Sequence, residues 1–191
     1  SYNIETVLLF NKIDQIEKKE KKELNKLVSI YKNAGYDCME ISGKKNINID
    51  KLKKYMINKS CVFSGHSGVG KSTLINKLDS RINIKTLPIS ESNLSGKHTT
   101  TFSEMYDLEF NSRIIDTPGI KGFGLYNVKN NELRDFFKEF TFLQNCKFNN
   151  CLHQNEPGCR VKKLVEKGDI SKSRYSNYIE LLSEINNNYR I

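Results

Sequence analysis

Long apolar runs are missing from this sequence of 191 residues, and their absence excludes a membrane-spanning protein. A helix that crosses a membrane needs about 18 or more consecutive apolar residues, and polar residues interrupt every apolar stretch here well before that length. The start of the chain, SYNIETVLLFNKID, also lacks the basic segment and cleavable apolar segment of a signal peptide. We therefore expect no membrane partner, and any targeting segment or upstream domain would lie outside these residues.

Arginine is scarce, since only six of the 31 basic residues are arginine. Against 22 acidic residues, the basic residues give a formal net charge of +9. This excess favours a polyanionic partner such as RNA, because neutralised phosphates release their counterions. Codon bias in an AT-rich genome would also enrich lysine at exposed positions, and the excess of basic residues is spread along the chain. Both interpretations, an RNA-facing patch and codon bias, stay open.

The five cysteines also do not resemble a secreted disulfide framework, because their number is odd and most of them are clustered. Three of them lie within 14 residues, in CKFNNCLHQNEPGC, beside a histidine. This clustering is more typical of thiolate ligands in an intracellular protein. The other two, Cys38 and Cys61, lie within apolar segments, and we expect them to be buried core residues.

The clustered residues Cys146, Cys151, His153 and Cys159 have the spacing C-x4-C-x-H-x5-C. Three thiolates and one imidazole satisfy the tetrahedral coordination of zinc. A segment this short has too small a hydrophobic core to fold without a bound metal or a covalent crosslink. Because no ligand position looks open for catalysis, we expect one structural zinc ion. The spacing differs from that of the commonest zinc fingers, so reduced cysteines without a metal are the alternative.

Apolar runs alternate with helical patterns over the first 116 residues. The expected strands are residues 6–10, 36–42, 61–65, 102–110 and 112–116, the last two as a hairpin, and the expected helices are residues 15–35, 48–58 and 72–78. This alternation indicates an α/β fold with a mostly parallel sheet and helices on both faces. Loops at the carboxyl ends of the strands should then lie together.

The pattern changes near residues 129–131. Residues 131–144 look helical, the cysteine-rich segment follows, and residues 171–190 read as a final amphipathic helix. We therefore expect an α/β domain over residues 1–130 and a small, mostly helical, zinc-binding domain over residues 131–191.

A phosphate-binding loop of the pattern G-x-x-x-x-G-K-S lies between a predicted strand and a predicted helix. Its glycines let backbone N–H groups converge on phosphates, where the helix N-terminus adds a positive dipole. We expect Lys71 to reach the β- and γ-phosphates and the Ser72 hydroxyl to bind magnesium. A chance match in a glycine-rich turn is the alternative. The residues expected to contact the nucleotide are Gly65, His66, Ser67, Gly68, Val69, Gly70, Lys71, Ser72 and Thr73.

The sequence NKID is expected to read the base through Asn11, Lys12 and Asp14. The carboxylate of Asp14 can accept hydrogen bonds from the N1–H and 2-amino groups of guanine, a donor pair that adenine lacks. Alone, the tetrapeptide also fits an ordinary strand-to-helix turn, but beside a phosphate loop it indicates GTP. The tripeptide Ser42-Gly43-Lys44, after the second strand, is expected to offer a backbone amide to the guanine oxygen.

Two further segments have the character of switch loops. In DTPG, Asp116 is expected to hold magnesium through water while the amide of Gly119 meets the γ-phosphate. In KHTTT, Thr100, with its neighbouring threonines as alternatives, is expected to bind magnesium only while the γ-phosphate is present. The alternative for any one of these threonines is a β-prone run that enters the next strand.

The order of these motifs is unusual. In an ordinary small GTPase the phosphate loop comes first and the guanine loop fourth, whereas here residues 11–14 and 42–43 precede the phosphate loop. The same site can form, because each loop still ends its own strand. The sequence therefore predicts a circularly permuted P-loop GTPase domain whose DTPG loop leads almost directly into the zinc-binding segment.

The ordered motifs NKID, ISG, GHSGVGKST, GKHTTT and DTPGIKGFGL, followed by the zinc motif, resemble the circularly permuted GTPases of the RsgA/YjeQ family, the small-ribosomal-subunit biogenesis GTPases. The resemblance covers nearly all of the chain. It implies GTP hydrolysis stimulated by the small ribosomal subunit, late in the maturation of that subunit, with release on hydrolysis. The implied partners are GTP, GDP and the small subunit with its rRNA, and the implied cofactors are zinc and magnesium. We expect a monomer in the bacterial cytoplasm or in an organelle of bacterial descent.

The sequence departs from the family pattern in two ways, and from the pattern of familiar GTPases in a third. Family members usually carry an N-terminal OB-fold that contacts ribosomal RNA, so either that domain lies outside these residues or the remaining domains contact RNA. His66 stands where the family often has glutamine. Familiar GTPases also use a glutamine just after the DxxG loop to orient the attacking water, but Ile120 and Lys121 follow that loop here. We expect His98 to position the water, and we count it with Lys71 and Thr100 as the catalytic residues.

Two rival interpretations remain. A GTP-gated RNA-binding or scaffold protein with negligible hydrolysis would need the same phosphate loop, so the motif does not separate it from an enzyme. A permuted GTPase that acts on the large subunit is disfavoured by the zinc segment after DTPG.

Overall fold

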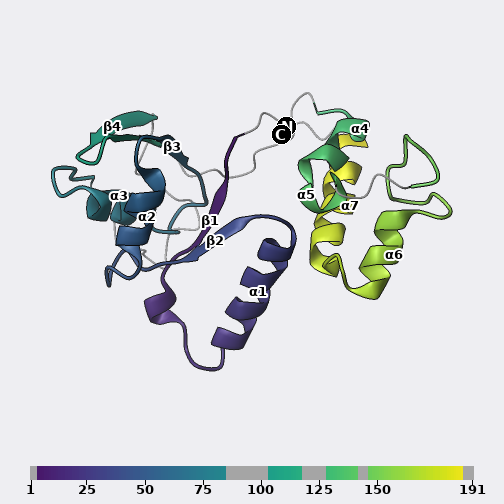
Figure 1. Cartoon of the computed structure of the whole chain (residues 1–191), viewed down its shortest axis with the longest axis horizontal. Helices are drawn as coiled ribbons and strands as arrows, with labels where there is room; N and C mark the ends of the chain where they lie inside the picture. Colours follow the sequence, from purple (N-terminus) through teal and green to yellow (C-terminus); the bar gives the residue numbers. More distant parts are fainter. Residues whose placement is uncertain (1–3, 85–102, 118–127, 142–145, 187–191) are drawn as a thin grey trace, which may run out of the picture. The chain divides into compact units, whose positions relative to one another are not determined.

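Helices and strands alternate through the first part of the chain, in the order that the sequence predicts (Figure 1). The computed structural model describes residues 4–84, 103–117, 128–141 and 146–186. The strands are β1 (Val7–Phe10), β2 (Asp37–Glu40), β3 (Ser60–Phe63), β4 (Glu104–Leu108) and β5 (Ser112–Asp116). The helices between them are η1 (Ile13–Gln15), a 3-10 turn, and α1 (Lys21–Asn33), α2 (Ile49–Met56) and α3 (Lys71–Leu78). The expected α/β class is confirmed.

The strands form two sheets in the part of the chain that the structure describes. One has the order β3-β5-β4, and β1 pairs with β2 in the other. β3 runs parallel to β5, with Phe63 opposite Asp116, and β4 runs antiparallel to β5 as the predicted hairpin. Because β3 and β5 are parallel and in register, the phosphate loop and Asp116 lie at the same edge of the sheet.

The core beside the larger sheet is built from α2 and α3. In α2, Ile49, Leu52 and Met56 recur at helical spacing and are almost completely buried. Their partners in the cluster are Leu74, Ile75 and Leu78 of α3, Ile114 of β5, Leu108 of β4 and Ile41. Burying each large aliphatic side chain is worth about 1.5–3 kcal/mol, so this cluster fixes α3, and with it the phosphate loop, against the sheet.

α1 begins later than the sequence pattern predicts. Ile16 lies before the helix with an extended backbone and is 38% exposed, because the lysines and glutamates that follow it provide no apolar face. Val28 is the buried residue of α1, and Gly35 ends it in the left-handed region, as predicted. Cys38 and Cys61 were expected to be buried core residues. Cys61 packs against the core of unit 2, but both are only partly buried, because neither of their four-residue strands is fully covered.

The helix expected over residues 131–144 is broken. It is replaced by α4 (Asn130–Leu133), η2 (Arg134–Phe136) and α5 (Lys138–Thr141), and α6 (Arg160–Lys167) and α7 (Lys172–Asn186) follow. The break at Phe137 lets the rings of Phe137 and Phe140 both meet the ring of Tyr178 edge-on, at centroid distances of 5.2 and 4.9 Å. These aromatic residues form the centre of the C-terminal core.

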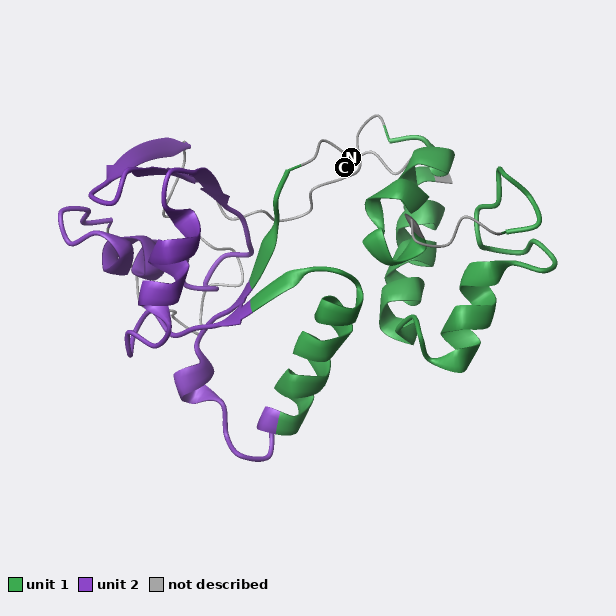
Figure 2. Ribbon diagram, in the orientation of Figure 1, with its two compact units in different colours: residues 1–8, 22–38, 124–191 green, residues 9–21, 39–123 purple. Residues whose placement is uncertain are grey.

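Figure 2 shows that the chain divides into two compact units. Unit 1 comprises residues 1–8, 22–38 and 124–191, and unit 2 comprises residues 9–21 and 39–123. α1 therefore groups with the C-terminal helices rather than with the phosphate loop. The boundary between folding domains near residue 130 stays a prediction. None of the helices within the described ranges is long and apolar enough to span a membrane.

Candidate nucleotide site and metal centre

The side chain of Asn11 joins three loops of unit 2. Its amide nitrogen donates to the backbone oxygen of Val69 at 2.9 Å. Its side-chain oxygen accepts from the backbone N–H groups of Gly43 at 3.2 Å and of Lys12 at 2.8 Å. These contacts connect the NKID loop with both the phosphate loop and the loop that follows β2.

Lys12 and Asp14 add two more connections. The Lys12 ammonium donates to the backbone oxygen of Gly68 at 2.7 Å, from a left-handed backbone with φ 65°. The carboxylate of Asp14 accepts from the hydroxyl of Ser42 at 2.5 Å, and the same hydroxyl accepts from the N–H of Lys45. Ser42 is fully buried. The predicted guanine-reading residues therefore lie together and orient one another.

The phosphate loop passes close to Asn11, and this close approach explains why residue 70 is a glycine. Gly70 has a left-handed φ of 96°, and a Cβ there would lie 2.5 Å from the side-chain nitrogen of Asn11. α3 begins at the next residue, so the first-turn amides of Lys71, Ser72 and Thr73 face the loop. The expected arrangement of strand, phosphate loop and helix is therefore present.

Lys71 lies at the centre of this loop. Its ammonium donates to the backbone oxygens of Gly65 at 2.7 Å and His66 at 3.2 Å. Burial lowers the pKa of Lys71, and the nearby carboxylate of Asp116 acts in the opposite direction. Asp116 ends β5 and is only 1% exposed. A cation and an acidic group thus lie where the phosphates and magnesium of a nucleotide would be expected.

Three of the predicted site residues, His98, Thr100 and Gly119, lie outside the described residues. The structure does describe Thr117, whose hydroxyl donates to the backbone oxygen of Phe63 at 2.9 Å. This bond ties the start of the DTPG motif to the end of β3.

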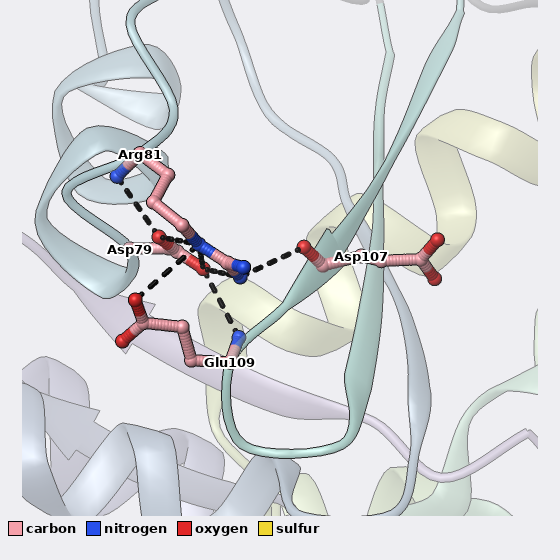
Figure 3. A network of polar contacts seen from close by, with 4 residues as sticks. All are labelled: Asp79, Arg81, Asp107 and Glu109. Atoms are coloured by element: carbon pink, nitrogen blue, oxygen red, sulfur yellow. Dashed lines mark hydrogen bonds and ion pairs between the residues drawn. The ribbon is translucent and has the colours of Figure 1, made fainter.

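A polar network that the sequence reasoning missed joins the end of α3 to the hairpin of β4 and β5 (Figure 3). The carboxylate of Asp79, which is 2% exposed, accepts from the Arg81 guanidinium at 2.6 Å and from the Glu109 N–H at 3.0 Å. Hydrogen bonds from Arg81 hold the pKa of Asp79 well below its usual range. Arg81 also pairs with the Glu109 carboxylate and reaches the backbone oxygen of Asp107. No motif marks this network, because its two halves, residues 79–81 and 107–109, are distant in sequence.

The predicted zinc ligands come together in unit 1. The ligand atoms of Cys146, Cys151, His153 and Cys159 all lie within 4.8 Å of one another. The Nδ1 atom of His153 faces the Cys146 and Cys159 sulfurs at 3.6 and 3.5 Å. All except Cys146 are buried. The donor set and its closeness fit a tetrahedral zinc ion.

Burial acts in opposite ways on the proton affinity of a thiol and of the imidazole in this cluster. Burial raises the pKa of the Cys151 thiol to about 12, and the neighbouring Cys159 adds to the rise. Burial lowers the pKa of His153, which favours the neutral imidazole that binds metals. A bound cation would offset the thiolate charge, because thiolate sulfurs coordinate it directly.

Groups around the cluster hold the ligand loop in shape, and sequence reasoning missed them. The carboxylate of Glu156 accepts from the backbone N–H groups of Leu152, Gln154 and Asn155. The hydroxyls of Tyr175 and Tyr178 donate to the backbone oxygens of His153 and Leu152, each at 2.7 Å. Glu156 could have been suspected from its place in the turn EPG between two ligands. The tyrosines could not, because they lie on a separate helix.

Comparisons with known proteins agree with the geometry. A family model described as RsgA GTPase matches residues 1–126. The protein named small ribosomal subunit biogenesis GTPase RsgA of Christiangramia forsetii is 48% identical over 192 residues, which cover 100% of this chain and 61% of that protein. Its namesake in Flavobacterium johnsoniae is 49% identical over 191 residues, covering 100% of this chain and 59% of that protein. The chain thus spans about 60% of the length of these relatives.

Solved structures show the same fold. The crystal structure of YjeQ from Thermotoga maritima aligns with a TM-score of 0.81 and 32% identity, covering 95% of this chain and 60% of that one. The structure of YloQ, described as a circularly permuted GTPase, aligns with a TM-score of 0.76 and 26% identity, covering 97% and 58%. The predicted circular permutation is confirmed by this likeness. On the match over residues 1–126, the chain belongs to the RsgA GTPase family.

Proposed function

We propose that this chain binds and hydrolyses GTP and acts late in the maturation of the small ribosomal subunit, with hydrolysis driving its release. The observation that carries the proposal is the pair of hydrogen bonds from Asn11 to Val69 and from Gly43 to Asn11. They bring a guanine motif and a phosphate-loop motif together, so that one nucleotide can contact both. The names of the two bacterial relatives support the ribosomal role.

In this proposal the carboxylate of Asp14 accepts the N1–H and 2-amino groups of guanine. The amide of Gly43 already donates to Asn11, so the amide of its neighbour Lys44 is the better donor to the guanine oxygen. Lys71 binds the β- and γ-phosphates, and magnesium is held by Ser72 directly and by Asp116 through water. Thr100 and the amide of Gly119 complete the γ-phosphate contacts.

Hydrolysis requires a group that positions water, and we assign this role to His98, with Lys71 and Thr100 stabilising the transferred phosphoryl group. The assignment rests on the sequence after Gly119, where no glutamine follows. We expect His98→Ala to lose turnover stimulated by the small subunit while it keeps its affinity for GTP. Full stimulated turnover in that variant would overturn the assignment.

We also propose that Cys146, Cys151, His153 and Cys159 hold one structural zinc ion. The buried cluster and the hydrogen bond from the Arg160 N–H to the Cys146 sulfur support this role. A metal analysis that finds no stoichiometric zinc would contradict it. We also expect the chain to be a monomer in the bacterial cytoplasm, where it contacts rRNA of the small subunit.

The decisive experiment measures GTP turnover by the full chain alone, with isolated small subunits and with isolated large subunits. We expect slow turnover that the small subunit alone raises. Binding of GTP without stimulated turnover would favour a GTP-gated scaffold, and stimulation by the large subunit alone would reject the proposed partner.

A further inference from the structure

The side chain of Arg174, on α7, is enclosed by groups from separate segments of unit 1. Its guanidinium donates to both carboxylate oxygens of Glu139, at 2.6 and 3.2 Å. Its central carbon lies 5.4, 5.7 and 4.7 Å from the ring centroids of Tyr31, Tyr36 and Phe137. The side chain is 14% exposed, and that of Glu139 is 6% exposed. This is a buried ion pair that aromatic rings surround.

Such a pair makes strict demands on its residues. Removing charges from water is unfavourable unless the partners are well oriented and their hydrogen bonds are satisfied. The planar guanidinium meets this condition, because it can donate two parallel hydrogen bonds while its face lies against aromatic rings. A glutamine at position 174 would leave the carboxylate of Glu139 buried without its cation.

A second cation holds the same end of α1. The ammonium of Lys138, in α5, donates to the backbone oxygen of Gly35 at 3.3 Å and lies 4.5 Å from the ring centroid of Tyr36. Gly35 is the left-handed residue that ends α1. Side chains of α5 and α7 therefore contact the carboxyl end of α1 in two places, through Lys138 and through Arg174.

The chain on either side of α1 carries the residues that would read guanine. Asn11 and Asp14 lie shortly before α1, and Ser42 and Gly43 follow it after β2. α1 is therefore joined to both loops by the chain itself, directly after the first loop and through β2 to the second. The hydrogen bond between Ser42 and Asp14 and the one between Gly43 and Asn11 are sensitive to the relative position of these two loops.

We propose that Arg174 is a positioning residue that couples the zinc-cluster helices to guanine recognition, because it holds the end of α1, the helix that lies between the two base-reading loops in the sequence. The proposal rests on the proposed function, since it requires that residues 11–14 and 42–43 bind guanine. It predicts that a change far from the nucleotide alters how well the base, rather than the phosphates, is recognised.

The test compares Arg174→Gln with Lys172→Gln in the full chain. Both variants remove one positive charge from α7, but Lys172 is exposed. The affinities for GDP and for inosine diphosphate, which lacks the 2-amino group of guanine, are measured by calorimetry. We expect Arg174→Gln to weaken GDP binding about fivefold to tenfold. We also expect it to reduce the preference for GDP over inosine diphosphate about threefold or more. Lys172→Gln should match the parent, and zinc content should stay the same in all three.

A preference for GDP that is unchanged in Arg174→Gln would overturn the proposal, because a merely structural role changes the active fraction and not this ratio. If that variant does not fold, Tyr31→Leu takes its place, since it removes a ring beside the guanidinium and keeps apolar bulk. The same fall in preference is then expected, and an unchanged preference overturns the proposal. A parent chain that binds no GDP would instead reject the proposed function, so the two failures are distinguishable.

Discussion

In unit 2 the described residues of the candidate nucleotide site come from four separate segments of the chain, whereas in unit 1 the four candidate zinc ligands come from one stretch of 14 residues. The first site is held by hydrogen bonds between loops, such as those of Asn11. The second is built into a core in which Cys151, Cys159 and Tyr178 are buried. The difference suggests that the nucleotide site depends on the relative position of its loops, and the metal centre on the stability of its core.

The largest effect is expected from removal of a zinc ligand. Cys151→Ser should abolish zinc binding and unfold the C-terminal helices, because zinc binding is worth about 10–16 kcal/mol to small zinc-finger peptides. Zinc analysis and thermal unfolding by circular dichroism measure the result. Cys38→Ser is the control, because Cys38 also lies in unit 1 but outside the cluster, and it should change stability by about 1 kcal/mol or less. Normal zinc content and melting in Cys151→Ser would contradict the contrast between the two sites.

Asp14→Asn should damage the nucleotide site without unfolding the chain. An amide cannot accept both guanine hydrogen bonds, so the affinity for GTP should fall about 100-fold or more and xanthosine triphosphate should become the better ligand. Asp50→Asn is the matched control, because it makes the same change at an exposed position of unit 2. Unchanged GTP affinity in Asp14→Asn would reject the assignment of the base.

Gly70→Ala tests the close approach of the phosphate loop to Asn11. A side chain in the left-handed region costs about 1 kcal/mol, and the 2.5 Å contact with Asn11 should add about 1–3 kcal/mol. Gly168→Ala shares the left-handed φ, but nothing lies within 4 Å of its new Cβ. Gly168→Ala should therefore lose only the unfolding free energy that the left-handed backbone costs. Equal losses of unfolding free energy in the two variants would show that the loops are not in contact.

The smallest effect is expected at Asp79, which stabilises unit 2 away from the nucleotide. Asp79→Asn should lower the free energy of unfolding by about 2 kcal/mol at pH 7, because the carboxylate bonds to Arg81 and to the Glu109 amide. The pKa of Asp79 is lowered in the folded state, so its stabilisation is complete above an unfolded-state pKa of about 4 and is lost as the pH falls below that value. Denaturant titrations should therefore show the difference between parent and variant shrinking below about pH 4. A difference that is constant down to pH 2 would exclude the carboxylate as its source.

The elements that the sequence predicted well are those with a local signal. The strand before Asn11, the hairpin of β4 and β5 and the helix that starts at Lys71 all follow from apolar runs and turn residues. The start of α1 and the break at Phe137 were missed, because both depend on packing rather than on periodicity. Ile16 is exposed rather than packed in a core. The chain turns at Phe137, so that the rings of Phe137 and Phe140 both contact the ring of Tyr178.

By itself, the sequence marked out the candidate residues for nucleotide and metal binding. Motif spacing predicted the phosphate loop, the guanine motif and the four candidate ligands, because each of these is a short segment whose proposed function requires particular residue types. Only the tertiary structure decided how distant segments meet, such as Asn11 with Val69, Asp79 with Glu109 and Arg174 with Tyr31. Such pairs depend on where packed helices and strands bring side chains, and the interval between two residues in a sequence does not encode the distance between them in space.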